Sequence, residues 1–225
     1  MGHGVDHVTV IDQIAIRRGG VRHIFDRIEP RRTAHIVVDM QNGFLAPGAP
    51  VEVPAARDIV EQVNCISKAV RAAGGTNIFL RFTSTDDPAN WSVQSQFAGA
   101  AAASQRESFR RGADSWQLWP ELDVLASDLV LDKTRFGAFI PGTCELKERL
   151  DALRLDTLLI TGTLSNCCCE STARDAMQLN YKVILIADAN AAPSDAEHAA
   201  TLFNLGWLFA DLRTTEEVVA MLRNP

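Results

Sequence analysis

Three kinds of reactive side chain each follow a short apolar run in this sequence. Asp39 offers a carboxylate, Lys133 an ammonium group, and the triplet Cys167-Cys168-Cys169 three thiols. A carboxylate can take up a proton, a thiol can attack a carbonyl carbon, and a neighbouring ammonium group can stabilise the thiolate. If the fold brings these residues together, they supply a base, a cation and a nucleophile for one catalytic site.

The apolar runs that precede these residues are predicted to be buried strands. They cover residues 36–38, 129–131 and 158–160, and short apolar runs bounded by turn residues are typical of such strands. In an open α/β sheet the strand ends border the crevice where ligands bind. We therefore expect Asp39, Lys133 and the thiols to converge at one edge of a sheet.

The cysteine triplet lies where a predicted strand turns into a predicted helix. Gly162 ends the apolar run, small polar residues follow, and a helical pattern comes after the thiols. A helix N-terminus presents unpaired N–H groups and a partial positive charge, which favour a thiolate and can hold an oxyanion. This argument does not choose among Cys167, Cys168 and Cys169.

Three ordered motifs resemble the isochorismatase-like family of cysteine hydrolases, which includes nicotinamidases, N-carbamoylsarcosine amidohydrolase and ureidoacrylate amidohydrolases. The motifs are VDMQNGF at 38–44, KTRFGAF at 133–139 and GTLSNCCCESTARDA at 162–176. The resemblance implies an α/β fold, a three-layer αβα sandwich with a six-stranded, mostly parallel sheet in the order 3-2-1-4-5-6. We expect an N-terminal arm over 1–32 and one hydrolase domain over 33–225.

The resemblance also implies a role for each reactive residue. The family motif places the nucleophile at Cys168, while Cys167 and Cys169 occupy positions that are usually apolar and are expected to be inert buried thiols. Asp39 would accept the thiol proton, and Lys133 would stabilise the thiolate and orient Asp39. A cis peptide bond is implied just before the oxyanion hole, between residues 163 and 164. The hole itself would be formed by the backbone amides of Leu164 and Cys168.

Aromatic side chains near these motifs are the predicted substrate-binding residues, namely Phe44, Trp91 and Phe136. Further candidates in the irregular region 83–121 are Phe97, Phe109, Trp116 and Trp119 and, for a substrate carboxylate, Arg106, Arg110 and Arg111. A guanidinium group binds a carboxylate with two parallel hydrogen bonds. The alternative is that the aromatic side chains cover the core beneath a long loop and the arginines are solvated.

Composition limits the other functions. With 225 residues, 47% hydrophobic content and a net charge of −6, the chain predicts one domain with a sizeable core and no nucleic-acid partner. No apolar run approaches the ~20 residues of a membrane helix. We expect a cytoplasmic homo-oligomer, dimeric or tetrameric, with reduced thiols. Its partner would be a small-molecule amide or ureido substrate.

The remaining patterns predict secondary structure without assigning function. Residues 8–11 could form a short strand or belong to an arm, and the histidines of the N-terminal segment, His3, His7 and His23, are expected on the surface. Apolar spacing predicts a helix over 54–73, with Cys65 as a small core residue. A strand is expected over 207–210.

The predicted function is a metal-independent cysteine hydrolase that cleaves a C–N bond of a small linear amide, carbamoyl or ureido compound through a thioester on Cys168. Residues 83–134 contain no histidine, so the metal ligands of metal-dependent nicotinamidases are missing and no cofactor is expected. One alternative is a thiol redox or sensor protein that uses Cys167-Cys169. Others are an isochorismatase-type vinyl ether hydrolase, which the cysteine nucleophile argues against, and a silent binding module.

Overall fold

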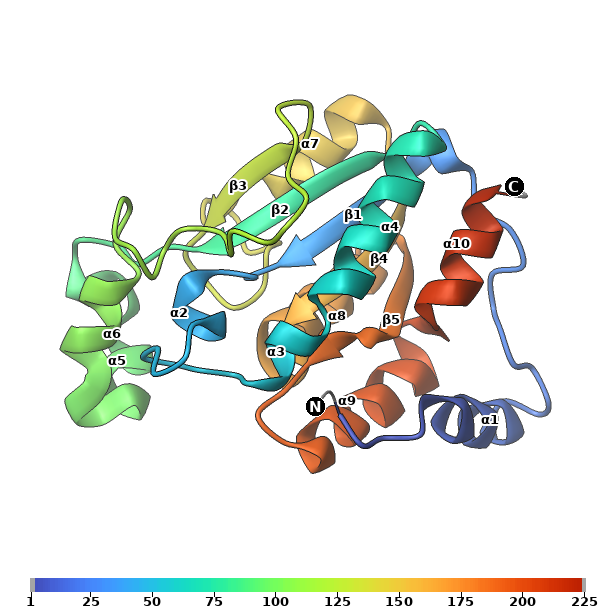
Figure 1. The fold of residues 1–225 in the computed structure, drawn as a ribbon, viewed down its shortest axis with the longest axis horizontal. Coiled ribbons are helices and arrows are strands. Elements are labelled where there is room, and N and C mark those ends of the chain that lie inside the picture. Colours follow the sequence, from blue (N-terminus) through green and yellow to red (C-terminus); the bar gives the residue numbers. More distant parts are fainter. Residues whose placement is uncertain (1–2, 224–225) are drawn as a thin grey trace.

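The computed structural model describes residues 3–223 and contains one sheet of six strands (Figure 1). The strands are β1 (Thr33–Val38), β2 (Thr76–Phe82), β3 (Leu129–Lys133), β4 (Thr157–Thr163), β5 (Lys182–Ala191) and β6 (Asp211–Arg213). Their order is β3-β2-β1-β4-β5-β6, and each neighbouring pair is parallel. The predicted fold class and strand order are confirmed.

Helices cover both faces of the sheet and complete the three layers. One face carries α1 (His7–Arg17), α7 (Leu146–Leu153), α8 (Glu170–Gln178) and α9 (Asp195–Leu208). The other carries α2 (Asn42–Leu45), α3 (Ala55–Asp58), α4 (Val60–Ala72) and α10 (Thr215–Arg223), and Figure 1 shows α4 and α10 crossing the sheet together. Among the described residues, no helix is both long and apolar enough to cross a membrane.

A separate segment extends beyond the ends of the strands, at the left of Figure 1. It contains α5 (Ser92–Ala98) and α6 (Ala102–Ser108), with short 3-10 turns at Pro88–Trp91 and Gly99–Ala101. We call residues 83–128 the insertion, because they lie between β2 and β3 without adding a strand. The insertion forms one wall of the cavity described below.

Alternate residues of each central strand enter two different cores. In β4, Leu158 and Ile160 pack against the α8 and α9 side, whereas Leu159 packs against the α4 and α10 side. Successive side chains of a strand point to opposite faces, and both faces of a parallel sheet are covered by helices. The continuous apolar runs of the sequence therefore reflect burial on both sides of the sheet.

Of the two alternatives for residues 8–11, a strand is wrong, because these residues lie within α1. Asp6 caps this helix by accepting a hydrogen bond from the Thr9 amide at 3.1 Å, and Ile11 and Ile14 are buried in the core cluster shared with α9. The surface prediction for His3 is also wrong. The side chain of His3 is 4% exposed and stacks on His198, with ring centroids 4.3 Å apart.

Three further expectations fail at helix faces and ends. Cys65 is exposed, because the buried face of α4 is formed by Val63, Ile66 and Val70 instead. The strand expected over 207–210 begins only at Asp211, since α9 continues through Leu208. The helix predicted over 54–73 is interrupted at residue 59 and forms α3 and α4.

Gly162 allows β4 to lie against β1 next to the predicted site. Its φ is +115°, and a Cβ atom there would overlap the carbonyl oxygen of Val38 and approach the Val38 nitrogen to 2.8 Å. Both atoms belong to the backbone of the paired strand and cannot move aside as a flexible side chain would. The close approach of these two strands therefore requires glycine at this position.

We expect Gly162→Ala to lower the free energy of unfolding, measured by urea denaturation. Gly142→Ala is the matched control, because Gly142 also has a positive φ of +74° but a Cβ atom there would meet nothing within 4 Å. Overpacking should make Gly162→Ala worse than its control by on the order of 1–3 kcal/mol. Equal losses in the two variants would show that backbone conformation alone, and not the contact with Val38, requires glycine.

Candidate active site

A buried ion pair lies at the carboxyl ends of the strands. Asp39 directly follows β1 and Lys133 is the last residue of β3, and Nζ of Lys133 lies 2.8 Å from Oδ2 of Asp39. Both side chains are 0% exposed. Asp39 has a φ of +51°, in the left-handed region that non-glycine residues seldom occupy and that clusters at functional sites.

Gln41 holds the segment after β1 against the end of β2. Its amide nitrogen donates to the carbonyl oxygens of Phe82 at 3.0 Å and Trp116 at 2.8 Å, and its Oε1 accepts from the Phe82 amide at 2.7 Å. The side chain is fully buried. Gln41 thus fixes the backbone two residues beyond Asp39. The sequence analysis gave it no role, although it lies within the first motif.

Cys168 lies in a tight turn after β4. The peptide bond between Thr163 and Leu164 is cis, as the family resemblance implied. A π-helical turn, η4, then covers Ser165–Cys169 and leads directly into α8. Turns of this kind occur frequently at functional sites. The turn brings Cys168, which is 3% exposed, to the wall of a cavity.

A neutral histidine secures this turn from the side of α9. Burial lowers the pKa of His198 to about 3, so its ring is uncharged. Its Nε2 then donates to the Ala187 carbonyl at 3.1 Å, and its Nδ1 accepts from the Ser165 hydroxyl at 2.9 Å. Because Ser165 lies next to Leu164, the histidine positions the turn that carries the thiol.

The three neighbouring thiols occupy different environments. Cys169 is buried in the core, as expected, whereas Cys167 is half-buried and lines the cavity beside Cys168. The prediction of an inert buried thiol is therefore wrong for Cys167, because the π-helical turn points two successive thiols towards the cavity. Cys168 interacts with the ion pair, and this interaction lowers the pKa of Asp39 and raises that of Lys133.

The charges of the site are set by burial and by the ion pair. Burial raises the pKa of Asp39 above its usual value, against the opposing effects of Lys133 and Cys168. Burial alone would lower the pKa of Lys133, but the combined effects of Asp39 and Cys168 outweigh burial and the pKa is raised. Contact with Cys167, followed by burial, raises the pKa of Cys168 well above its usual value, although Lys133 lowers it. The resting site therefore pairs a protonated thiol with a carboxylate of increased basicity.

The Asp39 carboxylate has capacity to accept a proton. Among residues 3–223, neither of its oxygens has a hydrogen-bond partner of good geometry, apart from the close ion pair with Lys133. A carboxylate engaged by several donors would be a weak base. The arrangement suits a general base next to a thiol that must lose its proton.

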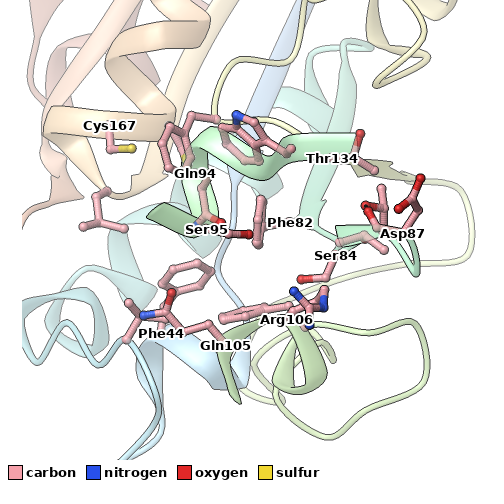
Figure 2. Close-up of a pocket in the computed structure, with 18 residues that line it drawn as sticks. Phe44, Phe82, Ser84, Asp87, Gln94, Ser95, Gln105, Arg106, Thr134 and Cys167 are labelled. Atoms are coloured by element: carbon pink, nitrogen blue, oxygen red, sulfur yellow. The ribbon is translucent and has the colours of Figure 1, made fainter. Parts of the chain in front are cut away.

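The cavity above Cys168 has a volume of about 230 Å³ (Figure 2). Its aromatic walls are formed by Phe44, Phe82, Trp91, Phe109 and Phe136. The predicted residues Phe44, Trp91 and Phe136 thus all line it, together with Phe109 from the wider set of candidates and Phe82, which the sequence analysis did not name. Leu164 also lines the cavity beside Cys168.

Except for Arg106, the other candidates of the insertion do not line the cavity. Trp116 is buried beneath it and donates a 2.8 Å hydrogen bond to Thr83, Trp119 packs in the core, and Phe97 is 90% exposed. Arg110 pairs with Glu107, and Arg111 pairs with Asp132. Arg106 is the candidate arginine that reaches the cavity.

The part of the chain that the structure describes contains no cluster of metal-ligating side chains. Over residues 3–223, no group of three or more His, Cys, Asp or Glu side chains has an arrangement that could hold a metal ion. The predicted site residues Asp39, Lys133 and Cys168 lie close together beside a cavity bounded by aromatic side chains.

Sequence comparisons identify relatives of this chain. A family model described as the isochorismatase domain matches residues 33–217. A protein named ureidoacrylate amidohydrolase RutB from Pseudomonas savastanoi pv. phaseolicola is 32% identical over 205 residues, which cover 81% of this chain and 82% of the relative. A protein of the same name from Caulobacter vibrioides is 29% identical over 84% of this chain and 91% of its own length.

Solved structures include proteins of similar fold. A cysteine hydrolase from Pseudomonas syringae pv. phaseolicola 1448A superposes with a TM-score of 0.82 at 29% identity, covering 89% of this chain and 97% of that one. N-carbamoylsarcosine amidase from Thermoplasma acidophilum shares the fold, with a TM-score of 0.67 at 24% identity and coverage of 82% and 97%. The matched domain and these relatives place the chain in the isochorismatase family of hydrolases.

Proposed function

We propose that this hydrolase is a metal-independent cysteine amidohydrolase that cleaves the C–N bond of a small linear amide, carbamoyl or ureido compound. The observation that carries the proposal is the fully buried Asp39–Lys133 ion pair beside the Cys168 thiol, at the wall of a cavity. The names of the ureidoacrylate amidohydrolase and cysteine hydrolase relatives support the same reaction class.

In the first half of the reaction, Asp39 accepts the proton of the Cys168 thiol as the sulfur attacks the substrate carbonyl carbon. The C=O electron pair moves to oxygen, and the backbone amides of Leu164 and Cys168 receive the resulting oxyanion. Lys133 remains cationic and stabilises the negative charge that develops on the sulfur as its proton leaves. A base of raised pKa suits this proton transfer, because the thiol itself is weakly acidic.

In the second half, the protonated Asp39 returns its proton to the leaving nitrogen and the C–N bond breaks. This step releases ammonia or an amine and leaves a thioester on Cys168. Asp39, again a carboxylate, then removes a proton from water, and the hydroxide attacks the thioester carbon. Collapse of this intermediate breaks the C–S bond, the thiol regains its proton, and a carboxylic or carbamic acid leaves.

The direct test is a panel of small primary amides, carbamoyl compounds and ureido compounds assayed for ammonia release. We expect at least one class to be hydrolysed, and intact-mass spectrometry of the quenched enzyme to show an acyl adduct at Cys168. Chelator-treated enzyme should keep its activity. Ammonia release without a cysteine adduct, or release that requires an added metal ion, would contradict the mechanism.

One observation favours a second candidate, thiol redox sensing. The Cys167 thiol contacts Cys168, and this contact lowers the pKa of Cys167, which increases its thiolate fraction. A sensor should show reversible oxidation between these two thiols and no ammonia release from any substrate. The buried Asp39–Lys133 pair has no role in that chemistry, so hydrolysis explains more of the site.

The pH dependence of kcat/KM should reveal Asp39 as the base. Its carboxyl must be ionised to accept the thiol proton, and burial raises its pKa above the usual value. Activity should therefore be retained above this raised pKa and fall as pH drops through it, giving an acidic limb at a higher pH than an ordinary carboxylate would produce. A profile that stays flat down to pH values near the usual aspartate pKa of about 3.9 would contradict this role.

A further inference from the structure

The cavity has two chemically different ends. Cys167, Cys168 and Leu164 form the reactive end, whereas Arg106 and Ser84 lie towards the other. Figure 2 shows Cys167 and Arg106 on opposite sides of the open space. A substrate with its scissile group at the thiol would therefore extend towards a guanidinium group.

Arg106 differs from the other arginines near the cavity because it has no partner. Within the described residues it makes no hydrogen bond, ion pair or cation–π contact, although it is half-buried. Its neighbours are engaged: Arg110 pairs with Glu107, Arg111 with Asp132, and Arg135 donates to Asn90 and lies over the ring of Trp91. An unpaired cation in a partly enclosed cavity is an available site for an anion.

The helix that carries Arg106 is fixed to the cavity wall. Phe109 follows α6, is 1% exposed, and packs its ring against Phe44 and Phe82 at centroid distances of 4.9 and 5.5 Å. The Ser84 amide donates a 2.9 Å hydrogen bond to the Phe109 carbonyl. A Cβ atom on Gly43 would overlap the Phe109 ring, so the contact is close. This anchor holds the Arg106 backbone in place before any ligand binds.

We propose that Arg106 binds the carboxylate of the substrate, so that the preferred substrates are short ω-ureido, ω-carbamoyl or ω-amido acids with the anionic group at the end away from the scissile bond. This inference rests on the proposed amidohydrolase function and adds the substrate class and the residue that selects it. A guanidinium group and a carboxylate form two parallel charge-assisted hydrogen bonds, which fix both distance and orientation.

The other charged side chain on the cavity, Asp87, does not change this assignment. Its Oδ1 accepts the Ala89 amide at 2.8 Å and so caps the 3-10 turn, and the side chain is exposed at the rim. Arg106 is more buried and has no competing partner in the described structure. The cavity volume of about 230 Å³ is below the ~300–1,000 Å³ that encloses drug-sized ligands. The linker between the two ends of the substrate is therefore short.

The test compares 3-ureidopropanoate with its uncharged methyl ester in wild-type enzyme and in Arg106→Gln. We expect the wild type to prefer the acid. Arg106→Gln should lower kcat/KM for the acid by roughly 10- to 100-fold, the value of a hydrogen-bonded charge, while changing the ester little. Arg106→Lys should recover part of the loss. Arg110→Gln is the matched control, because it removes an exposed positive charge next to α6 and should leave both substrates unaffected.

A binding measurement keeps this test independent of turnover. In Cys168→Ala enzyme, calorimetry should detect binding of 3-ureidopropanoate, and adding Arg106→Gln should weaken it by a similar factor with an unchanged thermal midpoint. Equal losses for acid and ester, no loss for either, or preference of the wild type for the ester would overturn the inference. Arg106-dependent binding without any ammonia release would instead refute the proposed hydrolysis and leave the anion site standing.

Discussion

Replacing Cys168 with alanine is expected to abolish turnover, with a loss in kcat on the order of 10⁵- to 10⁶-fold, as for other deletions of a covalent nucleophile. The reason is its position: of the three consecutive thiols, Cys168 is the one whose interaction with the ion pair lowers the pKa of Asp39 and raises that of Lys133. The fold should be retained, because the change removes a single sulfur atom from a site that borders a cavity. Ammonia release in single- and multiple-turnover assays measures the effect.

The matched control is Cys167→Ala. Cys167 lines the same cavity but makes no hydrogen bond to the ion pair, so most of the activity should remain. Loss of its contact should also bring the pKa of Cys168 back towards the usual value, since that contact raises it. If Cys167→Ala were inactive and Cys168→Ala active, the nucleophile would be misassigned. If both kept their activity, covalent catalysis by this turn would be refuted.

The second large effect is expected from Lys133→Met, in both activity and stability. The substitution leaves the Asp39 carboxylate buried without a cation, and removal of one partner of a buried ion pair costs about 3–5 kcal/mol in the free energy of unfolding. Lys133 also lowers the pKa of Asp39, so without it that pKa should rise further. The acidic limb of the pH profile should move to higher pH, and the maximal rate should fall by roughly 10²- to 10⁴-fold.

The double variant Asp39→Asn/Lys133→Met separates the two roles of the pair. It removes both buried charges, so much of the lost stability should return, because replacement of a whole buried pair is often nearly neutral. Activity should not return, since no base remains next to Cys168. Urea denaturation and ammonia release measure the two properties on the same samples. A double variant as unstable as Lys133→Met, or one that regains activity, would contradict this account of the ion pair.

The buried ion pair is an unfavourable arrangement for stability, and its catalytic role gives a reason for keeping it. Two fully buried charges lose their hydration, and their mutual attraction only offsets part of that loss. Their retention at the end of a central sheet is consistent with selection for chemistry rather than for stability. The left-handed backbone of Asp39 supports the same interpretation, because an unfavourable conformation persists where the surrounding structure holds it.

Much of this architecture was predictable from the sequence because the responsible patterns are local. Apolar runs such as 158–160 marked strands buried on both faces, and the residues that follow them marked the edge at which a parallel sheet binds ligands. The family resemblance supplied the strand order and the position of the cis peptide bond, both of which the structure shows. Asp39, Lys133 and Cys168 were named on this basis.

Other features depend on contacts between distant residues. The stacking of His3 on His198 joins residues 195 positions apart, since 198 − 3 = 195, and no local pattern records it. For the same reason a strand was one alternative for residues 8–11, although they belong to α1, which packs against α9. The insertion shows this most clearly. It contains several aromatic residues and several arginines, and some of each line the cavity while others of the same type lie outside it.

The sheet, the family and the three reactive side chains could be inferred without coordinates, because apolar runs, turn residues and motif order are properties of neighbouring residues. Packing was needed to show that Cys168 lies beside the ion pair, that Cys167 also lines the cavity, and that Arg106 reaches this cavity while Arg110 and Arg111 are paired elsewhere. These distinctions separate chemically identical side chains. They arise from which way each backbone segment turns, and packing between distant segments sets that direction.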